Sequence, residues 1–410
     1  MADAGALAVG LPRKLVNRVC YQVNLQRSLG GGEVFTRFFS RALASLGWRC
    51  TLFVSRGAAF WDRLKPPVGE IIEIEDESEL CTRLPNTEAL LITHGSLSEP
   101  LARALSERHV LAGFAHLPFF EREPGGFVHY RLLVAVSGYV LQSAHAKGLG
   151  NLHAEPVYGV ADLAPRGGAT PIIARSPYDW DKKKFRDRAL HWVERAAPRL
   201  FASGEALRRE SRTTLGIVSR LTPIKQFPAL FHIVSRILAR HPHIRLEIFG
   251  SGGYASVRDL RRALKPCARQ VRFWGLQEDV ASVYRNVDYV ISGLPEKEAL
   301  GLNLIEAQAS GTPVLAVRKP PFIETVREGV TGFLFRDPRE DEGMEFESVL
   351  TRISNPALRP DPLQAKAFLD QFSETAFRGR VERILHSLQA LMNPDGNQEE
   401  PGGKTRWGTS

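Results

Sequence analysis

Two glutamates, Glu298 and Glu306, bracket seven mostly apolar residues in the stretch EALGLNLIE. Burying a carboxylate is costly unless it is paired or hydrogen-bonded. The apolar residues from about Leu302 predict a packed helix that stops before Gly311 and Pro313. Glu298 would then lie in the loop between the strand DYVISG and this helix, with Glu306 one turn inside the helix. Such carboxylates can accept hydrogen bonds from a polyhydroxyl ligand, or they can be a surface residue and a satisfied structural acid.

The start of this predicted helix offers a second kind of ligand group. The N–H groups near Leu302, Asn303 and Leu304 are expected to be free and to point toward the same space as the glutamates. Helix N-termini attract phosphate, and each contact contributes about 0.3–1 kcal/mol at exposed sites. A ligand that carries both hydroxyls and phosphate, such as a sugar nucleotide, would match these groups.

A basic pair follows the first strand of the second half of the chain. In SRLTPIKQF, Arg220 and Lys225 lie in a predicted strand-to-helix turn at the same edge of the sheet. Arg can bind a diphosphate through two hydrogen bonds, and Lys supplies a point charge. A basic chain produces such pairs easily by chance, so the position after a buried strand is the informative part.

Glycines and histidines follow strands of the first half. Gly31 and Gly32 belong to SLGGGE, where glycine either forms a structural turn or lets the backbone approach a phosphate or sugar closely. The spacing is not GxGxxG and the Lys-Ser/Thr of a Walker loop is missing, so a nicotinamide or Walker site is not supported. His94 and His116 end two apolar runs. Each is either a hydrogen-bonded structural histidine or a ligand group, and we expect at most one to touch a substrate.

Short apolar runs that alternate with longer amphipathic runs must position these residues. The expected strands are RVCYQVNL, CTLFVS, ALLITH, VLAGFAHL and LLVAVS in the first half, then TLGIVSRL, IRLEIFG, VRFWG, DYVISG and TPVLAV in the second. The first helical pattern, VFTRFFSRALASLG, is expected to start at Val34 after the SLGGGE turn. Strands separated by helices imply parallel pairing in an α/β sheet. We therefore expect two doubly wound Rossmann-like domains that face a cleft, with a border near residues 200–212 and ligands outside the carboxyl ends of the strands.

Composition limits the class of protein further. The chain has 410 residues, a hydrophobic fraction of 43%, and Lys+Arg 54 against Asp+Glu 45, a net charge of +9 that permits anionic partners. The four cysteines have no zinc spacing and suggest a reducing cytoplasm, and no Asp-x-Asp or His/Asp cluster offers metal ligands. We expect no signal peptide, no membrane-spanning run and no nucleic-acid partner. The polar tail from Asn393 is expected to be disordered.

A basic stretch that contains tryptophan lies between the two halves. Its members are Lys182, Lys183, Lys184, Arg186 and Arg188, flanked by Trp180 and Trp192. Acidic lipid attracts each nearby Lys or Arg by about 1 kcal/mol, and Trp favours the headgroup region. The stretch is either an ordinary solvated helix, with Asp neighbours that weaken the local charge, or a segment that docks the protein on the inner face of the cell membrane.

Together, these motifs resemble the retaining glycosyltransferases of family GT4, group 1, which have the GT-B fold. The resemblance rests on LGGGE, GIVSRLTPIK, GSGG, VRFWGLQEDVASVYRNVDYVI, EALGLNLIEAQASGTPVLAV and IETVREGVTGFLF, and spans most of residues 15–392. It implies an acceptor-side domain at 15–205 and a donor domain at 206–375. A helix at 376–392 would pack back toward the first domain, and the tail would follow at 393–410.

The resemblance also implies the main contacts with a donor. Arg220 and Lys225 match the basic pair that holds the donor diphosphate. Glu298 matches the acid that contacts hydroxyls of the transferred sugar. Glu306 matches the acid that binds the nucleotide ribose.

Five further residues receive roles in the same way. Gly31 and Gly32 match the turn that approaches the donor phosphate and the acceptor. His116 matches a histidine near the sugar, and with Glu298 it is the catalytic candidate. Asn303 and Leu304 match the helix start near the phosphates.

The implied reaction transfers a sugar from a UDP-, GDP- or ADP-sugar to a hydroxyl of a glycan or lipid-linked acceptor, without a cofactor or metal. The family is thought to let the leaving phosphate deprotonate the acceptor, so Glu298 would orient and stabilise rather than attack. One departure is KPPFIE, where the family often has Gly-Gly before Ile-x-Glu. This departure affects the expected contacts near the sugar, including those of Glu324.

The expected function is therefore a cytoplasmic hexosyltransferase, peripheral to the membrane, in the synthesis of bacterial surface polysaccharide, lipopolysaccharide or glycolipid. One alternative is an epimerase or phosphorylase of similar fold. Another is a module that binds sugar nucleotides or glycans without catalysis. Transfer of a labelled sugar to a hydroxyl acceptor separates the first reading from both alternatives.

Overall fold

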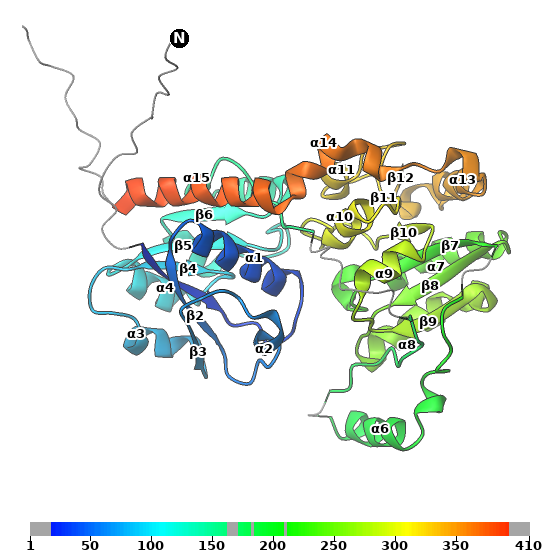
Figure 1. Cartoon of the computed structure of the whole chain (residues 1–410), viewed down its shortest axis with the longest axis horizontal. Helices are drawn as coiled ribbons and strands as arrows, with labels where there is room; N and C mark the ends of the chain where they lie inside the picture. Colours follow the sequence, from blue (N-terminus) through cyan, green and yellow to red (C-terminus); the bar gives the residue numbers. More distant parts are fainter. Residues whose placement is uncertain (1–17, 162–170, 182–183, 209–210, 393–410) are drawn as a thin grey trace, which may run out of the picture.

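The computed structural model of this chain describes residues 18–161, 171–181, 184–208 and 211–392. Two six-stranded parallel sheets lie next to each other along the long axis of the molecule, each with helices on its faces (Figure 1). The prediction of two doubly wound α/β units is confirmed. Lys182, Lys183, the expected start of the first domain at residue 15 and the tail 393–410 lie outside the described residues.

The first sheet has the strand order β3-β2-β1-β4-β5-β6, in which the chain reverses its direction of winding between β1 and β4. All five strand pairings are parallel. The strands are β1 (Val19–Asn24), β2 (Arg49–Ser55), β3 (Glu70–Ile74), β4 (Leu90–Thr93), β5 (Val110–Ala115) and β6 (Leu132–Ala135). The helices of this half are α1 (Gly31–Ser45), α2 (Trp61–Leu64), α3 (Leu80–Arg83), α4 (Glu99–Ser106) and α5 (Gly138–Ala146).

The second sheet repeats this order as β12-β11-β10-β7-β8-β9, so its reversal lies between β7 and β10. Its strands are β7 (Thr213–Val218), β8 (Ile244–Phe249), β9 (Val271–Gly275), β10 (Tyr289–Ile291), β11 (Val314–Val317) and β12 (Gly332–Phe335). The remaining helices are α6 (Phe185–Ala196), α7 (Phe227–Ala239), α8 (Tyr254–Ala263), α9 (Val280–Arg285), α10 (Leu302–Ala309), α11 (Phe322–Thr325), α12 (Pro338–Asp341), α13 (Met344–Ile353), α14 (Lys366–Leu369) and α15 (Glu374–Met392).

Helix α1 shows how the sequence builds the first half. Phe35, Phe39 and Leu43 recur four residues apart and are buried against the sheet, as the helical period requires. The helix begins at Gly31, three residues before the start expected from the apolar pattern. Gly31 and Gly32 therefore form its first turn and not a separate loop, because Gly30 already accepts the first helical hydrogen bond from the Val34 N–H at 3.3 Å.

Each sheet has its own hydrophobic core, and two segments join a core that lies far from them in sequence. Helix α15 follows the second sheet but buries Phe377, Val381 and Leu388 in the first core, against α1 (Figure 1). Ile172 and Ala174 precede the second sheet and are buried in the second core. On packing grounds we propose that the second unit includes residue 172, ahead of the border expected at 205/206.

Candidate functional site

Most candidate residues lie after β1, β4, β7 and β10, either in the loops there or in the helices α1 and α10 that follow. In both sheets these are the two strands between which the strand order reverses, and the crevice outside their carboxyl ends is where open α/β sheets bind ligands. The two loop sets also touch each other. A methyl group on Gly30 would lie 2.8 Å from Nη2 of Arg220, and one on Gly31 would lie 4.0 Å from the Leu302 side chain. We call this meeting place of the two halves the junction.

Glu298 lies in the loop after β10, where only 12% of its side chain is exposed. Its Oε1 accepts from the N–H groups of Ala299 and Gly301, both at 3.3 Å, and its Oε2 accepts a hydrogen bond from Nζ of Lys225. Burial alone would raise the pKa of Glu298, but the Lys225 ammonium and these N–H donors outweigh it and leave the pKa below its usual value. The carboxylate is therefore ionised and paired with Lys225. This ion pair and the two N–H donors offset the free-energy cost of removing the carboxylate from water.

Gln226 and Glu296 form a second link beside this ion pair. Gln226 follows Lys225 in a left-handed conformation, with φ of 53°, and donates from Nε2 to Oε2 of Glu296 at 3.1 Å. Glu296 precedes Glu298 by two residues, so two parallel links tie the turn after β7 to the loop after β10. Sequence reasoning missed both Gln226 and Glu296 because neither belongs to a recognisable spacing.

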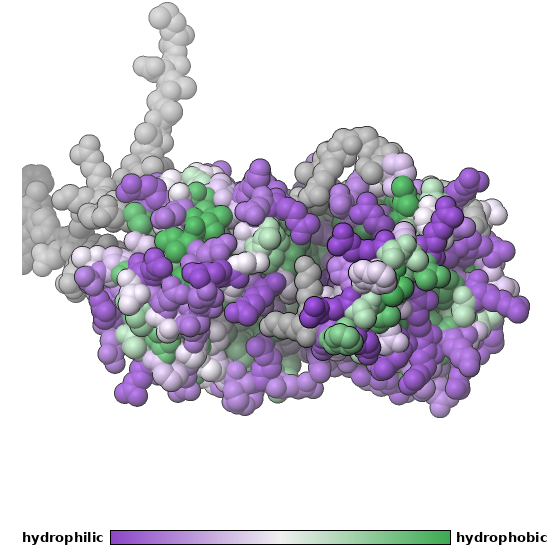
Figure 2. Space-filling model, turned by 90° about the horizontal axis from the view of Figure 1, so that it is seen from below, coloured by the Kyte–Doolittle hydropathy of each residue, from purple (hydrophilic) through white to green (hydrophobic). Residues whose placement is uncertain are grey.

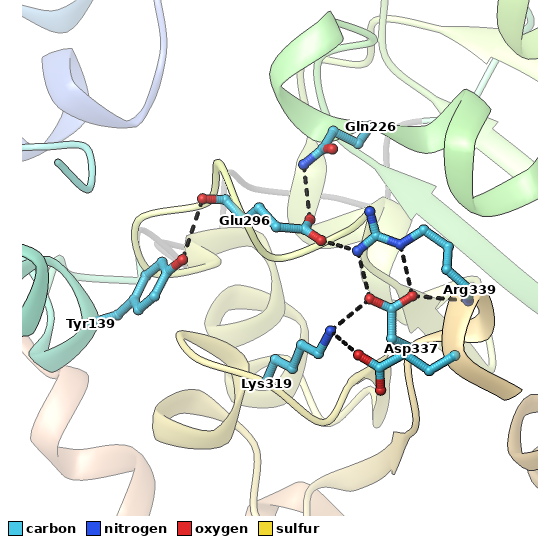
Figure 3. A network of polar contacts seen from close by, with 7 residues as sticks. Tyr139, Gln226, Glu296, Lys319, Asp337 and Arg339 are labelled. Atoms are coloured by element: carbon cyan, nitrogen blue, oxygen red, sulfur yellow. Dashed lines mark hydrogen bonds and ion pairs between the residues drawn. The ribbon is translucent and has the colours of Figure 1, made fainter. Parts of the chain in front are cut away.

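Figure 3 shows that Glu296 lies within a longer polar network, between Tyr139, Gln226 and Arg339. Arg339 contacts Glu296 and also donates from Nε to Oδ1 of Asp337 at 2.9 Å. Asp337 is 1% exposed and accepts from Nζ of Lys319 at 2.9 Å. The Tyr139 hydroxyl, from the first half, donates to the backbone oxygen of Glu296 at 3.4 Å. The loop that holds Glu298 is thus anchored from both halves.

Arg339→Met is expected to lower turnover about fivefold or less, because a partly exposed ion pair contributes only about 0.2–1 kcal/mol. The substitution removes the Arg339 contact of Glu296, leaves the one with Gln226, and loosens the loop without removing any group expected to touch substrate. Steady-state kinetics should show the change in kcat rather than in KM for the donor. Arg240→Met is the matched control, since Arg240 makes a similar exposed pair with Glu347 at 2.8 Å, remote from the junction. Equal losses in both variants would contradict a positioning role.

Glu306 lies on α10 with one carboxylate oxygen already fixed. The Tyr284 hydroxyl donates to its Oε2 at 2.8 Å. Burial and the nearby Glu306 carboxylate both raise the pKa of Tyr284, so Tyr284 stays protonated and remains a donor. Tyr284 lies 22 positions earlier in the chain, and only the tertiary structure pairs it with Glu306.

The start of α10 differs in one detail from the expectation of free N–H groups. The Leu304 N–H donates to the Gly301 carbonyl oxygen at 2.9 Å, because the first turn closes tightly on a left-handed Gly301, with φ of 80°. The Leu304 side chain is fully buried in the second core. Asn303 is part-buried and donates from Nδ2 to the Val218 oxygen at 3.2 Å, which ties α10 to the end of β7.

Arg220 spans the junction from the end of β7 to the glycine turn of the first half. Its guanidinium occupies the space that a side chain at Gly30 would need. Nearby Glu33 is only 4% exposed, and burial raises its pKa against the opposing effect of backbone N–H groups and Arg220. Gly32 has open space around its Cα, whereas Gly31 faces Leu302. The absence of a side chain at Gly30 therefore leaves the space that the Arg220 guanidinium occupies, and it lets the backbone of the two halves approach each other closely.

His116 and His94 lie side by side at the carboxyl edge of the first sheet, with ring centroids 5.9 Å apart. Burial lowers the pKa of His116 to about 4 and lowers that of His94 well below its usual value, so both rings are neutral near pH 7. Nε2 of His94 lies 2.9 Å from Oε1 of Gln22. This hydrogen bond within the first half is typical of a structural histidine. His116 Nε2 is buried and has no hydrogen-bond partner within the part of the chain that the structure describes.

Glu324 connects the second half to α5 of the first half. Its carboxylate accepts the backbone N–H groups of Gly138 and Tyr139, both at 2.7 Å, at the N-terminus of α5. Tyr158 also hydrogen-bonds to this carboxylate, and burial raises the pKa of Glu324 despite these contacts. In KPPFIE, the segment that departs from the family pattern, Glu324 thus contacts protein groups of the other half.

Metal ligands do not cluster in the described ranges. No group of three or more His, Cys, Asp or Glu side chains there could hold a metal ion. Within the same residues, no helix is long and apolar enough to cross a membrane.

Two doubly wound sheets that meet through their ligand-binding edges define the GT-B class of structure, and solved structures support this class. The chain resembles HepE of Anabaena, solved in complex with UDP, with a TM-score of 0.64 over 90% of this chain and 99% of that chain, at 16% identity. It resembles sucrose-phosphate synthase of Thermosynechococcus elongatus equally, with a TM-score of 0.64 over 91% and 99% of the two chains, at 15% identity. The fold is GT-B.

The second half can be assigned more closely. Residues 212–350 match the family model described as Glycosyl transferases group 1. The chain therefore carries a group 1 glycosyltransferase domain, as the motifs predicted.

Curated relatives agree with this assignment. A D-inositol 3-phosphate glycosyltransferase of Rhodococcus erythropolis is 34% identical over 45% of this chain and 48% of its own length. A phosphatidyl-myo-inositol mannosyltransferase of Mycobacterium tuberculosis is 26% identical over 63% of this chain and 64% of its own length. The matches thus span less than two thirds of these relatives.

Proposed function

We propose that this protein is a retaining glycosyltransferase that moves a sugar from a nucleotide-sugar donor to a hydroxyl acceptor. The observation that carries the proposal is the part-buried Lys225–Glu298 ion pair after β7 and β10, within a group 1 domain, with Arg220 across the junction. A carboxylate and two cations at this edge match a ligand that has both hydroxyls and a diphosphate.

Arg220 and Lys225 would bind the donor diphosphate and stabilise the negative charge that grows as the glycosidic bond breaks. Lys225 neutralises Glu298 in the free protein, and in the complex it would share its charge between that carboxylate and the phosphate. Glu298 would orient hydroxyls of the transferred sugar. The leaving phosphate, rather than a protein side chain, would take the acceptor proton.

Three other groups complete the proposed site. Glu306 would bind the ribose from α10, where the Tyr284 hydroxyl orients its carboxylate. The neutral Nε2 of His116, which has no hydrogen-bond partner among the described residues, would contact the sugar from the first half. The turn at Gly31 and Gly32, together with Asn303 and the start of α10, would line the path of the phosphates.

The acceptor would be a glycan or a lipid-linked molecule, in the synthesis of a bacterial surface polysaccharide or glycolipid. Support comes from two relatives, whose names refer to D-inositol 3-phosphate and phosphatidyl-myo-inositol. We propose that the protein works in the cytoplasm, at the inner face of the cell membrane.

A donor screen tests the proposal. Thermal shift with UDP-, GDP- and ADP-sugars identifies the donor, and a labelled form of that donor is then incubated with hydroxyl acceptors. Transfer of label with retained anomeric configuration supports the proposal. Epimerised or phosphorylated sugar would indicate an epimerase or phosphorylase instead. Donor binding without turnover across a broad acceptor panel would indicate a binding module.

Turnover is expected to survive EDTA. Arg220, Lys225 and the start of α10 supply the positive charge that a metal ion supplies to the leaving group in other sugar-transferring folds. Rates are compared before and after chelation and after adding magnesium or manganese back. Complete loss with EDTA that either metal restores would refute this prediction, and a metal-dependent glycosyltransferase assayed in parallel shows that chelation is effective.

A further inference from the structure

Helix α6 and the turn that follows it project from the second half on the side opposite α15 (Figure 1). Phe185, Trp192 and Leu200 are 84%, 72% and 74% exposed, the three highest values among the large apolar residues that the structure describes. Singly exposed apolar residues are ordinary, but these three fall within one short segment. Phe185 and Trp192 are two helical turns apart and therefore share one side of α6.

Basic side chains surround these apolar residues. Lys184, Arg188, Arg195 and Arg199 are all exposed. The three arginines form no ion pair with any residue of the described ranges. Figure 2, viewed from the side on which α6 projects, shows apolar surface next to hydrophilic surface on the second half. We call Phe185, Trp192, Leu200 and the four cations the outer face of α6.

Two acidic residues of the segment make inward contacts, and a third, Asp181, pairs with Lys184 at 3.4 Å. Asp187 is 3% exposed and accepts from Nη2 of Arg186 at 2.9 Å. Glu194 accepts from the Trp180 indole. The outer face therefore keeps the charge of its three arginines, whereas acidic Asp181 offsets the charge of Lys184. Trp180 is not part of this face, because its ring stacks on Tyr178 at 4.8 Å.

Contacts with the second half hold α6 in this orientation. The Arg186 guanidinium lies 4.4 Å from the centre of the Tyr254 ring, on α8. The Asp181 N–H donates to Oδ2 of Asp187 at 3.2 Å. These inward contacts leave Phe185 and Trp192 directed away from the protein body.

We propose that the outer face of α6 docks on an anionic lipid bilayer, with Phe185, Trp192 and Leu200 at the headgroup boundary and the four cations on acidic headgroups. Helices with aromatic residues and a strongly basic surround bind in the interfacial plane of membranes. A stable protein partner typically covers about 800 Å² on each side, more than one edge of a 12-residue helix presents. This inference names the surface through which the proposed function would reach a lipid-linked acceptor.

Co-sedimentation of the full chain with phosphatidylcholine vesicles, with and without phosphatidylglycerol, tests the proposal at low salt. The wild-type protein should bind only the anionic vesicles, and added salt should release it. Arg188→Glu/Arg195→Glu/Arg199→Glu should lower the partition coefficient at least about tenfold, and Phe185→Ser/Trp192→Ser should lower it severalfold.

Matched variants away from α6 show whether any equal loss of positive charge or of exposed apolar surface lowers vesicle binding. Arg49→Glu/Arg63→Glu/Arg103→Glu makes the same change in net charge on the first half, and Met344→Ser removes a side chain that is 70% exposed on α13. Both should bind like the wild type. Absent binding, equal binding to neutral vesicles, or equal losses in α6 and control variants would each overturn the proposal. Turnover on a soluble acceptor is measured separately, so failure of docking and failure of the proposed activity are distinguished.

Discussion

Glu298→Gln is expected to reduce turnover about 10- to 150-fold, the equivalent of about 1.5–3 kcal/mol for a charge-assisted hydrogen bond. The amide keeps the shape of the carboxylate, but it loses the charge that pairs with Lys225 and the capacity to accept two hydrogen bonds from sugar hydroxyls. Because the proposed partner is the transferred sugar, affinity for the free nucleotide should change little. Calorimetry with the nucleotide and steady-state kinetics with its sugar conjugate measure the two effects separately.

Glu306→Gln is the matched comparison, since it makes the same chemical change on α10, eight positions along the chain. Its proposed partner is the ribose, so it should weaken binding of the free nucleotide more than it lowers kcat at saturating donor. Equal effects of the two variants on nucleotide affinity would contradict this division of roles. Circular dichroism and thermal unfolding should show that both variants are folded.

Arg220→Ala is expected to weaken donor binding about 10- to 150-fold, again about 1.5–3 kcal/mol for a charged hydrogen bond. The loss should appear with the nucleoside diphosphate and be absent with the nucleoside, because the guanidinium is proposed to contact phosphate oxygens. Titration calorimetry with both ligands measures this difference. Unchanged affinity for the diphosphate, or an equal loss for the nucleoside, would show that Arg220 has another role.

Lys225→Ala should weaken diphosphate binding in the same way but should also lower the unfolding temperature. The substitution removes the Lys225 ammonium, whose charge lowers the pKa of the part-buried Glu298 carboxylate. A carboxylate left without this partner destabilises the folded protein. Arg220 is exposed, so its removal should leave the unfolding temperature nearly unchanged. The contrast between the two variants separates ligand contact from structural pairing.

Much of the fold was predictable from local pattern. Apolar runs such as TLGIVSRL and IRLEIFG lie on β7 and β8, and the alternation of strands with helices predicted two parallel sheets. The short strands β3 and β12 were not predicted, because Glu70–Ile74 mixes charged and apolar residues at an edge without regular alternation and Gly332–Phe335 is only four residues long. The start of α1 was placed three residues late, because glycine is a poor helix former and the pattern became apolar only at Val34.

The candidate site was predictable where it depends on strand ends. Parallel strands bring their carboxyl ends to one edge, so a residue that follows a buried strand is placed by topology alone, and this applies to Arg220, Glu298 and His116. The network of Glu296, Arg339 and Asp337 was not predictable, because its members come from segments with no shared spacing. The partners of Glu324 were missed for the same reason.

The sequence by itself determined which residues are present, the periodicities that form most strands and helices, and the edge of each sheet at which the candidate residues lie. Only the tertiary structure decided which charges pair. Lys225 meets Glu298 across 73 positions because β7 and β10 are neighbours in the second sheet, and Glu324 meets α5 across 186 because the two doubly wound units pack against each other. Local propensity acts over one turn or one strand, whereas the ionisation and orientation of a buried carboxylate depend on neighbours that only the packed chain brings within hydrogen-bond distance.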